Sequence, residues 1–159
     1  KGPELALDAI ADSRRTDLGL VVIGKWQDPD ELDRFTQKAK INHVEVLLVN
    51  DYVSTEDLRS YIASVDIVLV LNHNEGSSGI LLAAYSLDKP VVLSGSMSLR
   101  FDAQILQVPW VPSHPELLGR VLNHSVPFAS TKDGCKPQPD GSDFTASIIE
   151  LLEPASTTF

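Results

Sequence analysis

The side chains best suited to chemistry lie in one short turn, HNEGSSG (residues 73–79), which directly follows an apolar run. Gly76 and Gly79 carry no side chain, so the backbone there can approach a ligand closely. The hydroxyls of Ser77 and Ser78 can cap a following helix, whose first N–H groups then point at an anion such as a phosphate. The turn therefore predicts an anion site, although a serine that only caps the helix explains the pattern equally well.

Glu75 and His73 add two more polar groups to this turn. A carboxylate accepts hydrogen bonds from sugar hydroxyls, and an imidazole can donate or accept one. The alternatives are a solvated loop acid for Glu75 and a plain loop residue for His73. The four histidines show no metal-ligand spacing and Cys135 is the single cysteine, so we expect no metal site.

The glycines of the turn do not fit the better-known nucleotide and hydrolase motifs. No lysine follows the second glycine, so the turn is not a P-loop, and it is one residue short of a Gly-x-Ser-x-Gly nucleophile elbow. No glycine triplet follows the first predicted strand, which disfavours a nicotinamide cofactor. We expect no cofactor.

Strand-like and helix-like segments alternate around the turn. Continuous apolar runs rich in β-branched residues predict strands that are covered on both faces, at residues 18–24, 44–49, 66–71 and 90–94. The apolar spacing between these runs predicts helices, and residues 54–57 resemble a capping box. The alternation predicts an α/β fold, a Rossmann-like, open and mostly parallel sheet with helices on both faces.

The remainder of the chain has weaker signals. We expect a strand at 108–111, a helix from Pro115 to about Ser125, a loop rich in proline and glycine at 129–143, and a last helix from Phe144 to Leu152. A single domain would span residues 1–153, and residues 154–159 would form a flexible tail. Because a helix opens the sequence with no strand before it, we expect this domain to be part of a longer chain.

Two further segments follow predicted strands at the sheet edge that holds the turn. Gly24 and Lys25 end the first strand, and the lysine can supply a point charge to a phosphate. Tyr52 and Val53 follow the second strand and can form a wall beside a base or a sugar. The alternatives without a ligand are that Lys25 is an ordinary surface lysine and that Tyr52 and Val53 form a hydrophobic staple at the start of the next helix.

The net charge of −9, from 22 acidic and 13 basic residues, argues against a nucleic-acid partner. It does not exclude one small anionic ligand, which needs only a local positive potential. The apolar runs are far too short to span a bilayer, and no signal peptide opens the sequence. We expect a cytoplasmic protein with no integral membrane segment.

The order of these segments resembles that of a known family. From KGPELALDAI through LGLVVIGK and NDYVSTEDL to NEGSSGILLAAYSLDKPVV, the chain is similar to the C-terminal, donor-binding domain of GT-B glycosyltransferases, and most similar to the retaining group 1 type. The resemblance covers roughly residues 1–95. It implies that the substrate is a nucleotide-diphosphate sugar, and that an N-terminal domain of the same chain binds the acceptor.

The resemblance also implies roles for single residues. Glu75 would be the catalytic-site carboxylate, and the donor would be bound by Lys1, Gly24, Lys25, Tyr52, Val53, His73, Gly76, Ser77, Ser78, Gly79 and Ile80. In the retaining families a second glutamate follows the first after seven residues and holds the ribose hydroxyls. Ala83 stands at that position here, and a methyl group accepts no hydrogen bond.

Three interpretations follow from the resemblance. The first is the donor half of a glycosyltransferase, inactive without its N-terminal domain. The second is a catalytically degenerate module of the same fold that serves partner binding or regulation, which Ala83 favours. The third is part of a nucleotide-sugar 2-epimerase, which shares the two-domain architecture.

Overall fold

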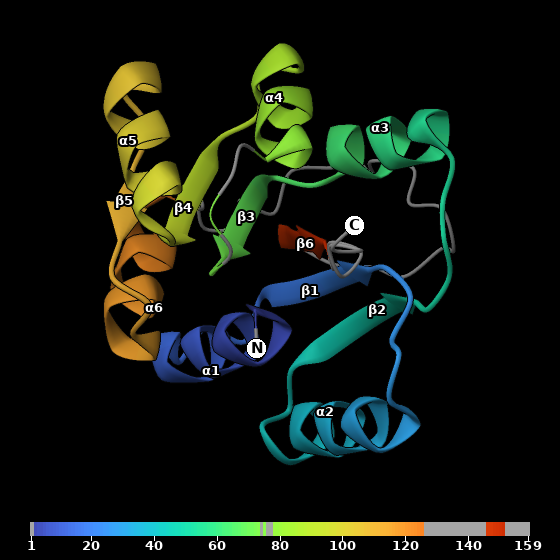
Figure 1. Ribbon diagram of the computed structural model, residues 1–159. Coiled ribbons are helices and arrows are strands. Elements are labelled where there is room, and N and C mark those ends of the chain that lie inside the picture. The colour runs from blue at the N-terminus through green and yellow to red at the C-terminus, as the bar shows by residue number, and fades with distance from the viewer. Residues whose placement is uncertain (1, 74, 76–77, 126–145, 152–159) are drawn as a thin grey trace, which may run out of the picture.

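The computed structural model describes residues 2–73, 75, 78–125 and 146–151 of the 159-residue chain, with the backbone alone at 125 and 146–151. Helices and strands alternate in these residues (Figure 1). In chain order they are α1 (Gly2–Ser13), β1 (Leu18–Ile23), α2 (Pro29–Ile41), β2 (Glu45–Val49), α3 (Thr55–Ser64), β3 (Ile67–Asn72), α4 (Gly79–Ser86), β4 (Val91–Gly95), α5 (Met97–Leu106), β5 (Trp110–Val111), α6 (Pro115–Ser125) and β6 (Ala146–Leu151).

The strands form one sheet in the order β2-β1-β6-β3-β4-β5. Every neighbouring pair is parallel, for example Val21 opposite Leu47 and Leu69 opposite Val92. The carboxyl ends of the strands therefore meet at one edge of the sheet, where open α/β folds bind their ligands.

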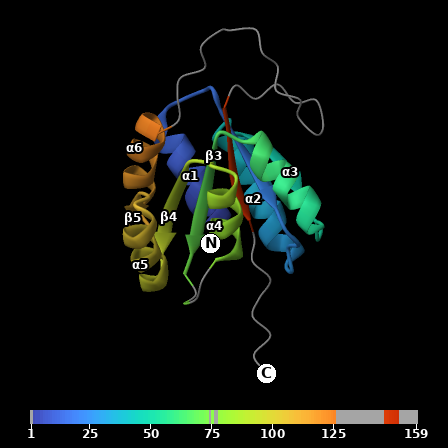
Figure 2. The same ribbon diagram turned by 90° about the horizontal axis from the view of Figure 1, so that it is seen from above.

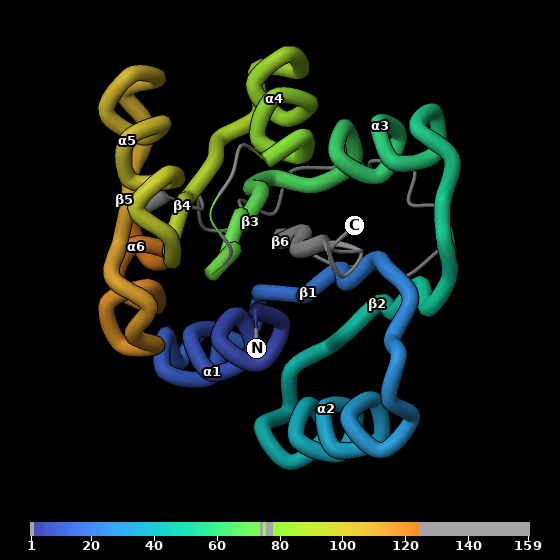
Figure 3. The backbone as a smooth tube through the Cα atoms, viewed as in Figure 1, coloured from blue at the N-terminus to red at the C-terminus, as the bar shows by residue number. Residues whose placement is uncertain are grey.

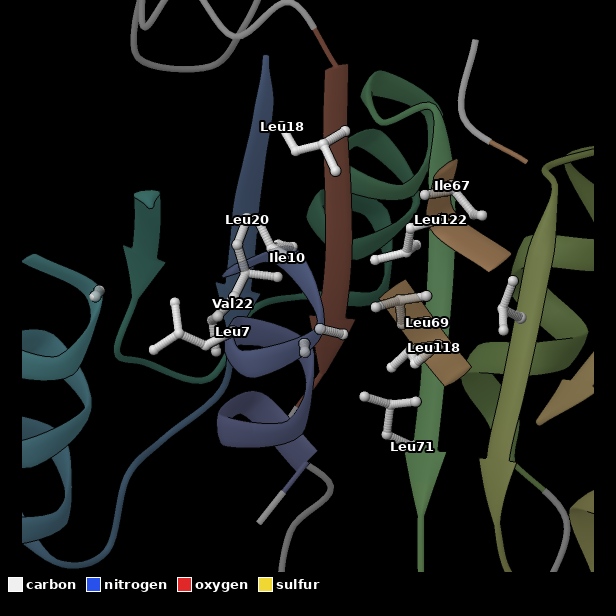
Figure 4. Close-up of a cluster of buried hydrophobic side chains, with 14 of the residues drawn as sticks. Leu7, Ile10, Leu18, Leu20, Val22, Ile67, Leu69, Leu71, Leu118 and Leu122 are labelled. Carbon is white, nitrogen blue, oxygen red and sulfur yellow. The ribbon is translucent and has the colours of Figure 1, made fainter. Parts of the chain in front are cut away.

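Helices cover both faces of the sheet (Figures 1 and 2). One hydrophobic cluster joins the sheet to α1, α2 and α6, and Figure 4 shows its centre. A second cluster joins the opposite face to α3, α4 and α5. Successive side chains of a strand point to opposite faces, so Leu20 and Val22 belong to the first cluster and Val21 and Ile23 to the second. This is why the strands read as continuous apolar runs, and the predicted fold class is confirmed.

Short polar side chains fix where several helices begin. The hydroxyls of Ser54, Ser78 and Ser96 accept hydrogen bonds from the third helical N–H of α3, α4 and α5, and Asp28 caps α2 in a similar way. Each cap satisfies a backbone donor that has no partner inside its helix. The capping-box prediction for residues 54–57 is confirmed in its serine, with Asp57 as the partner acid.

Two elements differ from expectation. The helix α5 was not predicted, although Leu99 and Ala103, four residues apart, are its buried residues. The predicted last helix, Phe144 to Leu152, is wrong, because Ala146–Leu151 forms strand β6.

The position of β6 gives the physical reason. It pairs with β1 over six residues and with β3 over three, so it fills the centre of the sheet (Figure 1). Without it, the inner edges of β1 and β3 would have unpaired N–H and C=O groups in the middle of the fold. A six-residue segment such as ASIIEL cannot be assigned to helix or strand by periodicity alone, and here the pairing with β1 and β3 decides.

Candidate functional site

The loops after β1, β2, β3 and β4 form the candidate site at the carboxyl edge of the sheet. The structure brings the first two together, and Figure 3 follows both as they leave the sheet for α2 and α3. The Trp26 N–H donates to Asn50 Oδ1 at 2.9 Å, and the Gly24 N–H donates to the carbonyl of Val49 at 3.0 Å. Lys25 is exposed, and its ammonium lies 3.5 Å from the carbonyl oxygen of Asn50. The ammonium therefore lies at the sheet edge with donor capacity left, because it carries three N–H groups.

Tyr52 and Val53 take different positions in the β2–α3 loop. The Tyr52 side chain is 71% exposed, whereas Val53 packs partly buried against the second hydrophobic cluster together with Leu58. Val53 precedes the cap Ser54, and Leu58 is the fourth helical residue, which are the two positions of a hydrophobic staple. Tyr52 therefore offers an exposed ring at the edge, and Val53 fixes the entry of the chain into α3.

The amino terminus of α4 lies at the same edge. Ser78 is buried, and its hydroxyl accepts the N–H of Leu81 at 3.4 Å. Ile80 packs against the second cluster, and a Cβ on Gly79 would meet no atom within 4 Å. The N–H groups of Gly79 and Ile80 donate to no acceptor in the part of the chain that the structure describes. The first turn of α4 thus keeps donors for an anion.

Glu75 is engaged with a different helix. Its Oε1 accepts the N–H of Met97 at 3.3 Å, and its Oε2 accepts the N–H of Ser98 at 3.1 Å. The Ser98 hydroxyl also donates to Oε2. These bonds seat the carboxylate on the first turn of α5, although Glu75 and Ser98 are 23 residues apart in the sequence.

The same contacts explain the charge state of Glu75. Hydrogen bonds from the Ser98 hydroxyl, and then from the Ser98 N–H, lower the pKa of Glu75 below its ordinary value, with a further contribution from the Met97 N–H. Donors that face the ionised carboxylate stabilise it relative to the protonated acid. Glu75 is therefore an acceptor at neutral pH.

Four residues near the edge were missed by the sequence reasoning: Asn50, Gly95, Ser96 and Ser98. Gly95 has a φ of +114°, and the Ser96 N–H donates to the carbonyl of Asn72 at 2.8 Å, so the β4–α5 turn closes tightly on the end of β3. The stretch SGSMS at 94–98 carried a signal, because a serine before a helix is typical of a cap. Nothing in the local sequence points from Glu75 to Ser98.

The remaining predicted residues are placed as follows. His73 directly follows β3 and is exposed. Lys1, Gly76 and Ser77 lie outside the described residues. No group of three His, Cys, Asp or Glu side chains within the described ranges could hold a metal ion, so the expectation of no metal site stays a prediction.

A second hollow lies away from this edge. It has a volume of about 650 Å³ and is lined by residues of α1 and α6 and by residues next to their ends, including Arg14, His114 and Arg120. Arg120 pairs with Glu116 at 2.6 Å, so part of its charge is already neutralised within its own helix. None of the residues that line this hollow belongs to the site that the sequence predicts.

Comparison with known families identifies the class of protein to which the chain belongs. The family described as glycosyl transferases group 1 matches residues 1–100, more than half of the chain. The chain belongs to this glycosyltransferase family. The matched segment runs from α1 into α5, so Glu75, the start of α4 and Ser98 all lie inside it.

Membership in the glycosyl transferases group 1 family confirms the resemblance to a GT-B glycosyltransferase domain. No curated protein and no solved structure matches this glycosyltransferase domain. Within the described ranges, none of its helices has the length and apolar character to cross a bilayer.

Proposed function

We propose that this glycosyltransferase domain binds a nucleotide-diphosphate sugar and forms the donor half of the enzyme. The observation that carries the proposal is the contrast between two neighbouring helices. The first turn of α5 is filled by the carboxylate of Glu75, whereas the first two N–H groups of α4 have no described acceptor. Helix amino termini stabilise anions, so the open terminus of α4 suits a phosphate of the donor.

In this proposal each residue has a chemical role. The N–H groups of Gly79 and Ile80, together with the Lys25 ammonium, balance the negative charge that develops on the diphosphate as it leaves. The carboxylate of Glu75, held ionised on α5, accepts a hydrogen bond from a sugar hydroxyl. The exposed ring of Tyr52 provides an apolar surface beside the base or sugar. A cytoplasmic location and the lack of a cofactor stay predictions from the sequence.

Calorimetric titration with UDP, GDP, ADP and their glucose or mannose derivatives tests the proposal. We expect at least one of them to bind, and Lys25→Ala to weaken the binding roughly 10-fold, about 1.4 kcal/mol, because a charge-assisted contact to phosphate is lost. Lys40→Ala is the matched control, since Lys40 is an exposed lysine on α2. Absence of heat and of any thermal shift with every ligand would contradict the proposal.

We further propose that the chain transfers no sugar by itself, because the acceptor site belongs to an N-terminal domain of the full enzyme. A coupled assay that detects the nucleotide diphosphate released from each donor measures whether the chain transfers sugar. Sustained turnover by the purified 159-residue chain would refute this part of the proposal and leave donor binding intact.

A non-catalytic module is the second candidate, and Ala83 favours it. Ala83 lies on α4 and is partly buried against the second cluster. Its methyl group accepts no hydrogen bond from ribose hydroxyls. The substitution Ala83→Glu should tighten nucleotide binding if only this acceptor is missing, provided that a parallel urea titration shows the variant folded. An unchanged affinity in a folded variant would favour the non-catalytic module.

A further inference from the structure

We propose that Ser98 is a positioning residue for Glu75. It fixes one oxygen of the carboxylate on α5 and leaves the other oxygen to accept a hydroxyl of the donor sugar. This inference deepens the proposed function and rests on it for the identity of the ligand. The geometry of the carboxylate stands independently of any ligand.

The two carboxylate oxygens of Glu75 differ in how much of their acceptor capacity is used. Each carboxylate oxygen has two lone pairs. Oε2 receives two donors, the N–H and the hydroxyl of Ser98, so its capacity is used. Among the described residues, Oε1 receives only the N–H of Met97, at the longer distance of 3.3 Å. The acceptor position that is left is on Oε1, which suits one hydroxyl and not a bidentate ligand.

The contact is more than a helix cap, because α5 already has one. The Ser96 hydroxyl accepts the N–H of Leu99 at 3.3 Å, which satisfies the third donor of the helix. Glu75 takes the first two, those of Met97 and Ser98. The start of α5 is therefore saturated by the chain itself, and these hydrogen bonds hold the carboxylate at a defined place on the first turn of α5.

The charged and titratable groups on the surrounding elements are few. They are His73 after β3, Tyr85 on α4, and Arg100 and Asp102 on α5. The Arg100 guanidinium lies over the Trp110 ring at 5.2 Å from its centroid. Glu75 forms no ion pair with any described residue. Removal of the Ser98 hydroxyl should therefore change the position and the pKa of the Glu75 carboxylate more than removal of any of these groups.

The first experiment needs no ligand. The pKa of Glu75 is measured by NMR of the side-chain carboxyl carbon in the whole chain, with Glu75→Gln to assign the signal. We expect Ser98→Ala to raise this pKa, Ser98→Thr to restore it in part, and Ser86→Ala to leave it unchanged. Ser86 is the matched control because its hydroxyl bonds within α4, to the carbonyl of Ala83 at 2.8 Å. An unchanged pKa in Ser98→Ala would overturn the inference.

The second experiment separates the sugar from the nucleotide. For UDP against UDP-glucose, and GDP against GDP-mannose, the ratio of the two Kd values isolates what the sugar contributes. We expect Ser98→Ala to reduce the ratio of the nucleotide Kd to the nucleotide-sugar Kd roughly 5- to 10-fold, which is within the range of one typical net hydrogen bond, and to leave the Kd of the nucleotide alone unchanged.

The outcomes distinguish this inference from the proposed function. If the wild-type chain binds no nucleotide and no nucleotide sugar, the donor-binding proposal fails and the ligand part of this inference fails with it. If the wild type binds and Ser98→Ala keeps the same ratio, the inference fails and donor binding stands. An equal loss for nucleotide and nucleotide sugar would show a merely structural role and would also overturn it.

Discussion

Gly95 gives the sharpest test of how the candidate site is built, because the β4–α5 turn has no room for a side chain. Its φ of +114° lies in a region that other residues rarely adopt. A Cβ added there would press on the carbonyl oxygen of Asn72 and would lie 2.7 Å from the carbonyl carbon. That oxygen cannot easily move, since it accepts the N–H of Ser96 at 2.8 Å. The perturbation is Gly95→Ala.

The magnitude follows from these contacts. A residue forced into a sparsely populated backbone region costs about 1–3 kcal/mol. Weakening the hydrogen bond between Ser96 and Asn72 costs a further ~0.5–1.5 kcal/mol. We therefore expect Gly95→Ala to lower the free energy of unfolding by roughly 2–4 kcal/mol. For a domain whose total is about 5–15 kcal/mol, this is a large fraction.

Urea denaturation followed by far-UV circular dichroism measures the loss. With a slope of about 2 kcal/mol/M, in the middle of the usual range for small proteins in urea, the midpoint should fall by roughly 1–2 M. Gly79→Ala is the matched control, because a Cβ there meets nothing within 4 Å and the residue opens a helix. We expect this control to be neutral or to stabilise by about 0.4–1 kcal/mol, since alanine restricts the unfolded chain.

Gly95→Ala is expected to destabilise the fold and Gly79→Ala is not, so the two stability changes can contradict the explanation. If Gly95→Ala stays within about 0.5 kcal/mol of the wild type, the size of an ordinary surface substitution, the turn tolerates a side chain and its tight closure on β3 is wrong. If both variants lose the same stability, the cost comes from replacing glycine in general and not from the contact with Asn72.

Three further predictions concern the edge and its supports. Ser78→Ala should cost about 1 kcal/mol of stability in urea, since α4 loses its cap, and Ser86→Ala should cost less; equal losses would contradict the cap. Lys89→Met should cost roughly 1–2 kcal/mol in the same assay, because the Lys89 ammonium donates to two carbonyls at the end of α3, at 2.5 and 2.8 Å; no loss would show these bonds to be irrelevant. Because the pKa of Glu75 is lowered in the folded state, its carboxylate stabilises the fold at pH values above the ordinary carboxyl pKa, and this stabilisation is lost as the pH falls through the folded-state pKa. Glu75→Gln should therefore make the free energy of unfolding depend less on pH in the acid range, and an unchanged pH dependence would contradict this linkage.

The sequence was sufficient for the parts of the fold whose signal is local. Residues 18–24 and 66–71 read as strands because they are buried on both faces, and burial on both faces leaves an unbroken apolar run. The last strand could not be predicted in this way. Residues 146–151 form a strand because β1 and β3 offer unpaired edges, which is a property of distant segments.

The same limit applies to the site. Strand ends in a parallel sheet share one edge, so the sequence placed Gly24, Tyr52 and Glu75 in one neighbourhood. It could not tell which helix would receive the Glu75 carboxylate. The turn HNEGSSG leads directly into α4, yet the carboxylate bonds to α5, which begins after a turn that is tied to the end of β3 by the bond from the Ser96 N–H to the Asn72 carbonyl.

This division between the two helices also explains how an acidic chain can hold an anion. A net charge of −9 gives no general attraction for a diphosphate, so binding must rest on local donors. The chain already contains one such case, since the start of α5 holds the carboxylate of Glu75 and lowers its pKa. The start of α4 has the same type of donors without an internal carboxylate among the described residues. In the proposed function, an anion from outside would meet the open terminus of α4 and not the filled terminus of α5, and Glu75, already bound to α5, would contact the neutral part of the ligand.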